Sequence, residues 1–437
     1  MKLSKLFFMA AMGLGLAACT ENDLVEGGDS NGAQNEGTTY VGFTIDFSKT
    51  QTRATEESTP SEQKINKAYV ILADGNTISQ VVSSVADGSN KYVLQTTPGP
   101  HDFYVVVNPT TAPTTSNTVS EYFNTGVAIG AEEFAKTTAG SESFLMASVK
   151  KETFDIADGI TEKEALEGTD AATNNFTINV ERVAAKVTMT CADPKLTSDN
   201  NNAAGGKISD TKFNLNGGAT KAYRMAQSTI KEIPDNAWSY TVKGVDVATT
   251  GDHTAAAPAY CLENLHAIAD NYLQKNTTYL TLKTTFKPTN VVNCNDPLNG
   301  LTSNKYVEGS GDELTFYVVK QGELAGNYLM KKDLEDFQTG DGNEGKYPEG
   351  VEKLSDPYGN GECWFGPIWI GQEEANDAIA PIYRNTWYNL EITGITLPGD
   401  PKEPTIDSEQ PLTPKTNVAI TLSVMPWNFI NREIDLQ

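Results

Sequence analysis

Histidine and cysteine are both scarce in this chain. Its 437 residues include three histidines and five cysteines. Many hydrolase sites and most zinc centres are built from these two residue types. The histidines, His101, His253 and His266, are far apart in the sequence and form no metal-binding or triad motif. The composition therefore argues against an enzyme, and it predicts no catalytic residue, no metal site and no cofactor.

Basic residues are also few. Lysine and arginine total 33 against 57 aspartates and glutamates, which gives a formal net charge of -24. A chain this acidic is repelled by phosphate backbones, so we expect no nucleic-acid partner. Long apolar runs are missing after the N-terminus: no later segment reaches the eighteen or so residues that a membrane-spanning helix requires. The chain is therefore not a polytopic membrane protein.

The N-terminus has the features of a secretory signal. Lys2 and Lys5 precede an apolar stretch of about thirteen residues, 6–18, which is too short to span a bilayer. The stretch ends in Leu-Ala-Ala-Cys, which resembles the bacterial lipobox, with Cys19 as the acylated residue. The alternative is an ordinary cleavage site with a cysteine nearby by chance. We interpret the chain as an exported lipoprotein whose only membrane anchor is lipid on Cys19.

Four cysteines remain after Cys19. They are Cys191, Cys261, Cys294 and Cys363. An oxidising compartment permits disulfides, and four cysteines allow three pairings that the sequence does not distinguish. Buried free thiols are an equally good interpretation. The spacing does not indicate a zinc site.

The sequence pattern of the rest of the chain indicates short strands separated by turns. At about 150 residues per domain, its length predicts two or three domains. Helical periodicity is weak, although a short helix is expected at 127–135. The number and spacing of strands predict an all-β protein of two sandwiches, with the boundary near 186–190. The expected strands are 40–47, 67–72, 80–85, 91–95, 103–107, 143–148, 176–180, 183–189, 212–215, 279–286, 314–320, 364–370, 387–395 and 418–425.

The first of these strands is separated from the others. Residues 20–37 are polar and predict a flexible tether. The strand that follows places Val41, Phe43, Ile45 and Phe47 on one face. Residues 48–60 are again polar and contain Arg53 followed by Ala54. This pattern predicts a lone strand joined to the main body by a loop that is open to proteases.

The C-terminus carries a second isolated strand. Residues 396–416 contain five prolines among charged residues and predict an extended, semi-rigid spacer rather than a packed segment. In the strand beyond it, Val418, Ile420, Leu422 and Val424 share one face, and Trp427 follows. Such a strand must pair with another because its exposed edge would otherwise aggregate. Folding back onto its own sheet and pairing with another molecule are both consistent with the pattern.

Several of these segments together resemble the Bacteroidales fimbrillins, and most closely the shaft subunits of the minor fimbria. The resemblance covers most of the chain and is most specific at its two ends. It rests on the lipobox at Cys19, the strand followed by Arg53-Ala54, and the segments 180–187, 259–264, 382–388 and 424–427.

The resemblance implies two transthyretin-like β-sandwiches that polymerise into a type V pilus. It divides the chain into a signal peptide (1–18), a lipidated propeptide with a removable first strand (19–53), an N-terminal sandwich (54–187) and a C-terminal sandwich (188–437). The C-terminal sandwich would include the spacer and a donor strand (417–437). An Arg-specific protease would cut between Arg53 and Ala54 at the outer membrane. The released strand would leave a groove for the donor strand of another copy or of a related pilus subunit.

Two other interpretations remain open at this stage. A surface glycan-binding lipoprotein can also be a β-sandwich on a lipid tether, but it would need exposed aromatic residues and no scissile arginine. A tip or anchor subunit of the same pilus could lack either cleavage or a donating C-terminus. Because both features are present, the sequence favours a shaft subunit that supports adhesion.

Overall fold

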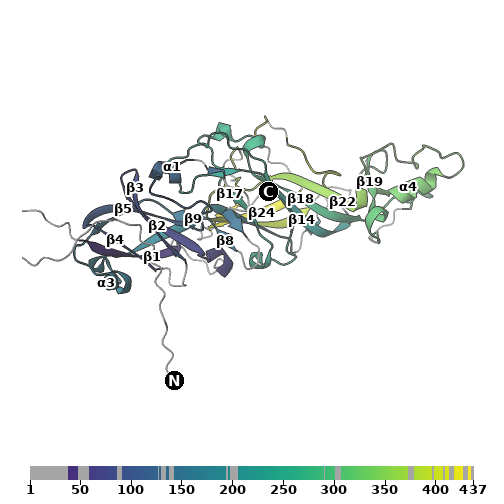
Figure 1. The fold of residues 1–437 in the computed structure, drawn as a ribbon. Helices are drawn as coiled ribbons and strands as arrows, with labels where there is room; N and C mark the ends of the chain where they lie inside the picture. The colour runs from purple at the N-terminus through teal and green to yellow at the C-terminus, as the bar shows by residue number, and fades with distance from the viewer. Residues whose placement is uncertain are drawn as a thin grey trace, which may run out of the picture.

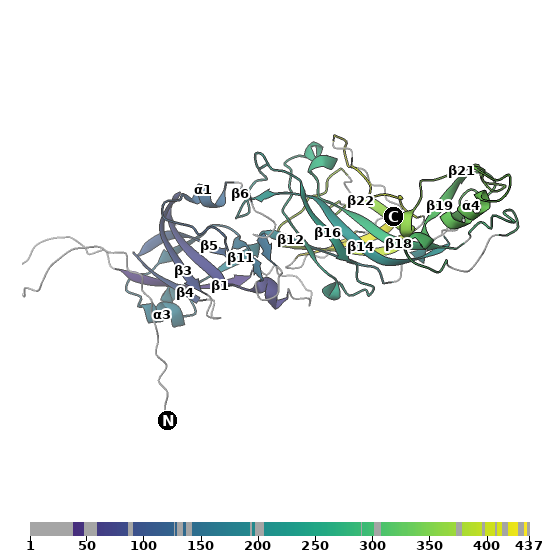
Figure 2. The same ribbon diagram turned by 45° about the vertical axis from the view of Figure 1, so that its right-hand side comes forward.

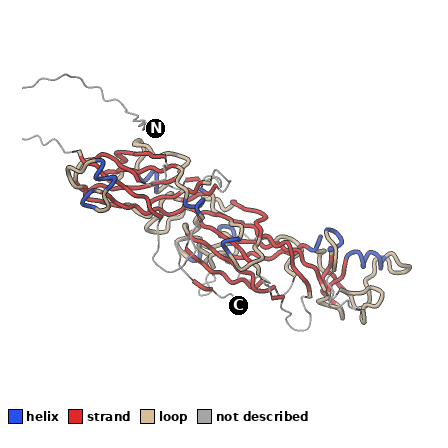
Figure 3. Tube along the Cα trace, turned by 90° about the horizontal axis from the view of Figure 1, so that it is seen from below, coloured by secondary structure: helices blue, strands red, loops and turns tan. Residues whose placement is uncertain are grey.

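The fold of the chain is given by a computed structural model. It describes residues 38–47, 59–85, 91–125, 127–128, 134–136, 142–192, 195–196, 205–289, 291–300, 307–372, 378–395, 398–406, 409–412, 418–426 and 432–434. Strands dominate, and the helices are short (Figure 3). The prediction of an all-β protein is confirmed. Within the described residues, no helix has the length and apolar character needed to cross a membrane.

The N-terminal sandwich is built from the first eleven strands. Its main sheet runs in the order β3-β2-β5-β9-β11-β1-β4, with β10 paired to β5. These strands are β1 (Thr39–Phe47), β2 (Lys67–Asp74), β3 (Thr77–Val85), β4 (Lys91–Thr96), β5 (Gly99–Val107), β9 (Met146–Ser148), β10 (Glu152–Ile156) and β11 (Asn175–Arg182). Shorter elements of this region are η1 (Pro60–Gln63), α1 (Val119–Phe123), β6 (Val127–Ala128), β7 (Ala135–Lys136), β8 (Ser143–Phe144), α3 (Glu162–Glu167) and η2 (Ala171–Thr173).

This sheet folds over on itself around one core. β1 and β5 are not neighbours in the sheet. Nevertheless, the rings of Phe43 on β1 and Phe103 on β5 lie 4.7 Å apart. Both side chains are fully buried in a cluster that includes residues of β2, β4 and β11. The two halves of the sheet therefore face each other, and β1 supplies part of the core between them.

The C-terminal sandwich has two separate sheets. One runs β17-β12-β23-β24-β25, with β13 paired to β23, and the other runs β16-β14-β18-β22. Side chains from both sheets, including Met189, Phe213 and Leu390, share one core. The strands are β12 (Ala184–Thr190), β13 (Lys195–Leu196), β14 (Gly206–Gly218), β16 (Tyr240–Asp246), β17 (Ala259–Leu262), β18 (Tyr279–Pro288), β22 (Glu362–Trp369), β23 (Thr386–Ile395), β24 (Val418–Pro426) and β25 (Arg432–Ile434).

The two sandwiches lie end to end, and a small module extends beyond the second (Figures 1 and 2). The module contains β19 (Phe316–Gln321), β20 (Tyr328–Met330), β21 (Lys353–Leu354) and α4 (Lys331–Gln338) around a small apolar cluster. The remaining short elements are β15 (Lys221–Ala222), which pairs with β6, and the 3-10 turns η3 (His253–Ala255), η4 (Ala269–Asn271), η5 (Gln274–Asn276), η6 (Gly311–Leu314) and η7 (Gly359–Gly361).

The structure differs from the sequence predictions at three places. The first strand of the C-terminal sandwich begins at Ala184, so the boundary lies earlier than predicted. The helix expected at 127–135 includes the helical residue Phe134, but it is wrong at both ends, where β6 and β7 are strands. The third difference is the Pro-rich stretch, whose described residues pack on the C-terminal sandwich. Leu412 is buried in an apolar cluster with Tyr272 and Trp369. Single apolar residues can anchor such a stretch even where its average composition is polar.

Candidate functional site

The candidate site is β1 and the groove that holds it. β1 lies between two strands of the N-terminal sandwich: it pairs in parallel with β11 and antiparallel with β4. The strand is therefore hydrogen bonded along both edges, with Phe43 opposite Phe176 on one side and Tyr92 on the other. Removal of β1 would leave unpaired backbone groups on both neighbours.

The predicted apolar row of β1 points into the core. Val41, Phe43 and Ile45 are at most 2% exposed, while Phe47 is half-buried at the end of the strand. The Phe43 ring also lies within 6.4 Å of the rings of Phe154 and Phe176. This first strand is an integral part of the core, although a tether and a polar loop flank it in the sequence.

The beginning of β1 is held by segments outside the sheet. Thr39 donates its hydroxyl to the Ala157 carbonyl at 2.8 Å, and the Tyr40 N–H donates to the Ile160 carbonyl at 3.0 Å. The Asn174 side-chain amide donates to the Tyr40 carbonyl at 3.0 Å and to the Ala157 carbonyl at 2.9 Å. Asn174 is fully buried and left-handed, with a φ of 49°. Residues 157–174 thus form part of the groove.

η1 follows the polar loop and is anchored to the other sandwich. Glu62 caps η1 by accepting the Thr59 N–H at 2.9 Å. Its second carboxylate oxygen lies 2.8 Å from the Lys186 ammonium on β12 and accepts the Tyr260 hydroxyl at 2.8 Å. The Glu62 and Lys186 side chains are 2% and 6% exposed. Lys186 also lies 4.0 Å from the centroid of the Trp387 ring.

Electrostatics keep Glu62 ionised despite its burial. Burial opposes ionisation, but the Lys186 ammonium and hydrogen bonds from Lys186, Thr59 and Tyr260 outweigh it and lower the pKa of Glu62 below its ordinary value. Arg182 reinforces the junction by donating to the Glu62 carbonyl at 2.9 Å. Its guanidinium lies 5.7 Å from the Phe47 ring at the end of β1. The end of β1 and the helix after the loop therefore meet at the junction of the sandwiches.

The predicted donor strand lies in the C-terminal sandwich. β24 contains Val418, Ile420, Leu422 and Val424 and pairs antiparallel with β23, as far as Pro426 opposite Thr386. On its other side β24 pairs with β25, the last described strand of the same chain. The alternative that the sequence left open, folding back onto its own sheet, therefore describes this monomer. β1 and β24 are not brought together within one chain.

Four other predicted site residues belong to segments that the structure does not describe. Cys19, Arg53, Ala54 and Trp427 lie outside the described residues. The four later cysteines are all described: Cys191, Cys261, Cys294 and Cys363 are buried, and none of them forms a disulfide. Of the two possibilities that the sequence left open for them, the structure has buried thiols rather than bridges. Among the described residues, no cluster of three or more His, Cys, Asp or Glu side chains could hold a metal ion.

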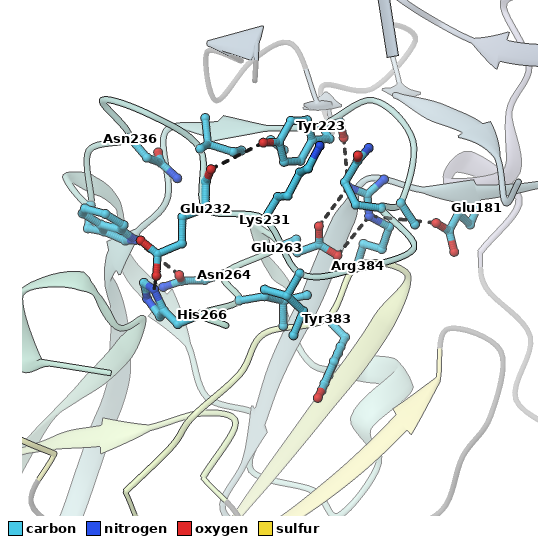
Figure 4. Close-up of a pocket in the computed structure, with 17 residues that line it drawn as sticks. Glu181, Tyr223, Lys231, Glu232, Asn236, Glu263, Asn264, His266, Tyr383 and Arg384 are labelled. Carbon is cyan, nitrogen blue, oxygen red and sulfur yellow. Dashed lines mark hydrogen bonds and ion pairs between the residues drawn. The ribbon is translucent and has the colours of Figure 1, made fainter. Parts of the chain in front are cut away.

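A pocket of about 400 Å³ lies near the junction, where Glu181 from β11 meets loops of the C-terminal sandwich (Figure 4). Its charged groups largely pair with each other. Arg384 donates to both carboxylate oxygens of Glu263, at 3.0 and 3.1 Å, and to the Tyr223 carbonyl at 2.9 Å. The His266 ring lies 3.3 Å from a Glu232 carboxylate oxygen. These contacts hold loops together, and we assign the pocket no ligand.

Glu181 is less completely paired than Arg384 and Glu263 in this pocket. One of its carboxylate oxygens is buried without a hydrogen-bond partner, 3.9 Å from the Arg384 guanidinium. Burial raises the pKa of Glu181 to about 7; the Arg384 charge opposes this rise, and the Glu263 charge adds to it. This carboxyl group therefore titrates near neutral pH at the junction.

The sequence predictions missed the groups that hold β1 and η1 in place. Glu62 and Lys186 are 124 positions apart (186 − 62), and no local pattern pairs them. The sequence predictions also missed that Gly42 lies directly against the Ala165 carbonyl of α3, although a glycine within a strand often marks a close backbone approach. That glycine is the one local signal from which the contact could have been found.

The comparisons with known proteins agree with the resemblance. Residues 356–433 match the family model described as major fimbrial subunit protein type IV, fimbrillin, C-terminal. The solved fimbrilin of Porphyromonas gingivalis is 16% identical, with a TM-score of 0.51 over 91% of this chain and 99% of that chain. A putative cell adhesion protein of Parabacteroides distasonis is 13% identical, with a TM-score of 0.50 over 90% and 100%. Comparison with curated proteins found no match. At these identities the solved structures show a shared fold.

Proposed function

We propose that this chain, whose residues 356–433 match the fimbrillin C-terminal family and whose fold is that of a fimbrilin, is a structural subunit of a surface fimbria. The precursor is exported to the outer membrane as a lipoprotein acylated at Cys19. An Arg-specific protease cuts between Arg53 and Ala54, and β1 is released. Residues 417–437 of another copy, or of a related pilus subunit, then enter the vacated groove, and repetition builds a fibre that supports adhesion.

The observation that carries the proposal is the place of β1 in the sheet. The strand that precedes Arg53 in the sequence supplies fully buried core residues and is hydrogen bonded along both edges. Burial of Val41, Phe43 and Ile45 at about 1.5–3 kcal/mol each amounts to about 5–9 kcal/mol, before ordering costs are subtracted. Loss of this strand would expose the core residues packed against it and the backbone groups of both neighbours, which favours binding of another strand by β-augmentation.

The C-terminal strand fits the role of donor. β24 and β1 each have nine residues. β24 alternates aliphatic residues with smaller or polar ones, as a strand covering a core must. It lies on the outer side of β23, and among the described strands β25 of the same tail is the one beyond it. A head-to-tail contact of this kind does not close on itself, so it produces a filament.

Cleavage would leave the rest of the subunit in place. The polar loop joins Phe47 to η1, and η1 is fixed to the C-terminal sandwich through Glu62 and Lys186. After a cut at Arg53, the new N-terminus would therefore remain attached at the junction, while β1 would lose its covalent link to the body. The presence of both a removable strand and a C-terminal strand favours a shaft subunit over a tip or anchor subunit.

The proposal can be tested with two complementary variants of the purified precursor. Arg53→Ala keeps its first strand, so it can donate but not accept. A chain lacking 418–437 can accept but not donate. After treatment with an Arg-specific protease, the wild type is expected to give a detergent-resistant ladder on an unheated gel. Each variant alone should give monomers, and their mixture should give dimers and nothing longer.

Lys49→Ala is the matched control, because it changes the other basic residue of the loop without touching the scissile bond. It should form the ladder as the wild type does. A ladder that survives in either single variant would contradict the proposal, as would a wild type that is cut at Arg53 and stays monomeric.

A further inference from the structure

At Gly42, β1 approaches the backbone of the helix that covers it very closely. A Cβ atom at this position would lie 1.9 Å from the Ala165 carbonyl oxygen of α3 and 2.6 Å from the carbonyl carbon. Real Cβ atoms do not approach backbone oxygens so closely, so this position accepts glycine alone while α3 stays in place. Gly42 has an ordinary strand conformation, and its requirement for glycine comes from the close approach.

α3 packs on the outer face of β1. Tyr40, Thr44 and Asp46 point to the same side as Gly42 and are half-buried, whereas Gly42 is buried. The helix is fixed at its start by the Thr161–Glu164 capping box. At its other end, the Asn175 side-chain amide donates to the Ala165 carbonyl at 2.6 Å. The same carbonyl that excludes a Cβ at position 42 is therefore tied to β11.

The proposed donor strand has no residue that satisfies this requirement. No glycine follows Gly399 in the sequence, so residues 417–437 all carry a Cβ or a larger side chain. Whatever register or direction this strand takes in the groove, a residue that takes the place of Gly42 brings a Cβ into contact with Ala165. The smallest residue of the strand, Ala419, meets the same obstacle.

We propose that α3 is a latch that admits only the chain's own first strand, and that it must be displaced when a donor strand enters. Gly42 is the specificity-determining residue of this latch. The inference rests on the proposed function, since it concerns how the groove distinguishes the propeptide from the donor. It also implies that release of β1 loosens the latch, because Ala157, Ile160 and Asn174 lose the hydrogen bonds that they make to Thr39 and Tyr40.

The first experiment alters the latch from the propeptide side. Gly42→Ala in the precursor should lower its Tm and speed the appearance of the ladder after cleavage by about 5- to 30-fold, since crowding of this kind weakens docking of β1. Residue 42 is absent from the cut subunit, so the fibre formed is chemically the same as the wild-type fibre. Gly251→Ala is the control, because no atom lies within 4 Å of a Cβ at that glycine.

The second experiment alters the donor. Glycine is placed singly at Ala419, Thr421 and Ser423, which lie on the face opposite the aliphatic row. The variant with glycine at the position that faces Ala165 in the fibre should assemble faster than the wild type. The other two should assemble no faster, because glycine weakens a strand. Hydrogen exchange should show residues 157–168 at least about tenfold less protected in the wild-type fibre than in the precursor.

The outcomes separate the latch from the exchange itself. A wild-type ladder in which 157–168 keep their protection, or a Gly42→Ala precursor as stable and as slow as the wild type, would overturn the latch and leave strand exchange standing. A wild-type subunit that is cut and forms no ladder would overturn the proposed function and the latch with it.

Discussion

Phe43→Ala should destabilise the precursor and leave the fibre unchanged. The Phe43 side chain is 1% exposed and packs 4.7 Å from the Phe103 ring, between the two halves of the N-terminal sandwich. Truncation of such a side chain removes its transfer free energy and leaves a cavity, at a cost of about 3–5 kcal/mol. For a domain of this size, 1 kcal/mol corresponds to about 2–4 °C in Tm, so the transition of this sandwich should fall by about 10 °C.

The assay compares two states of the same preparation. Calorimetry of the intact precursor should show the loss in Tm, and the ladder formed after cleavage should dissociate at the wild-type temperature because it no longer contains residue 43. Phe213→Ala is the control: Phe213 is fully buried in the core of the C-terminal sandwich, so it should weaken precursor and fibre alike. A fibre that inherits the defect of Phe43→Ala would refute the idea that β1 leaves.

Three further predictions follow from the junction and the thiols. Lys186→Met removes the ammonium that pairs with the buried Glu62 carboxylate and should cost about 3–5 kcal/mol in urea unfolding. Much of that loss should be restored when Glu62→Gln is added to the same chain; a double variant no more stable than Lys186→Met alone would contradict this. Because the pKa of Glu181 rises from 4.5 unfolded to about 7 folded, the folded state binds the extra proton, and stability should fall as pH rises from 4.5 to 7. Glu181→Gln should remove that slope and stabilise the protein at pH 8 by about 1–3 kcal/mol in the same assay; an unchanged slope would refute the assignment. A thiol reagent should label none of the four later cysteines in the native protein and all of them in urea, without prior reduction.

The sequence alone predicted the parts of the fold that depend on local pattern. Alternation of apolar and polar residues was sufficient to locate β1, β11, β18 and β23, because a strand with one face in the core must repeat every two residues. The predicted inward residues Val41, Phe43 and Ile45 are all buried. β10 and β16 were missed because their residues are mostly half-buried or exposed, so their pattern is weak. The Pro-rich stretch was misjudged because its average composition hides the residues that pack.

Tertiary structure decided which strands are neighbours and what surrounds them. The N-terminal signal pattern and the two isolated strands predicted an exported β protein with a separate strand at each end, since those features lie within short windows of sequence. Only the fold placed β1 between β11 and β4, joined Glu62 to Lys186, and set the Ala165 carbonyl against Gly42. Such contacts depend on how distant segments meet in space. A one-dimensional pattern shows which face of a strand is buried, but not which atoms cover it.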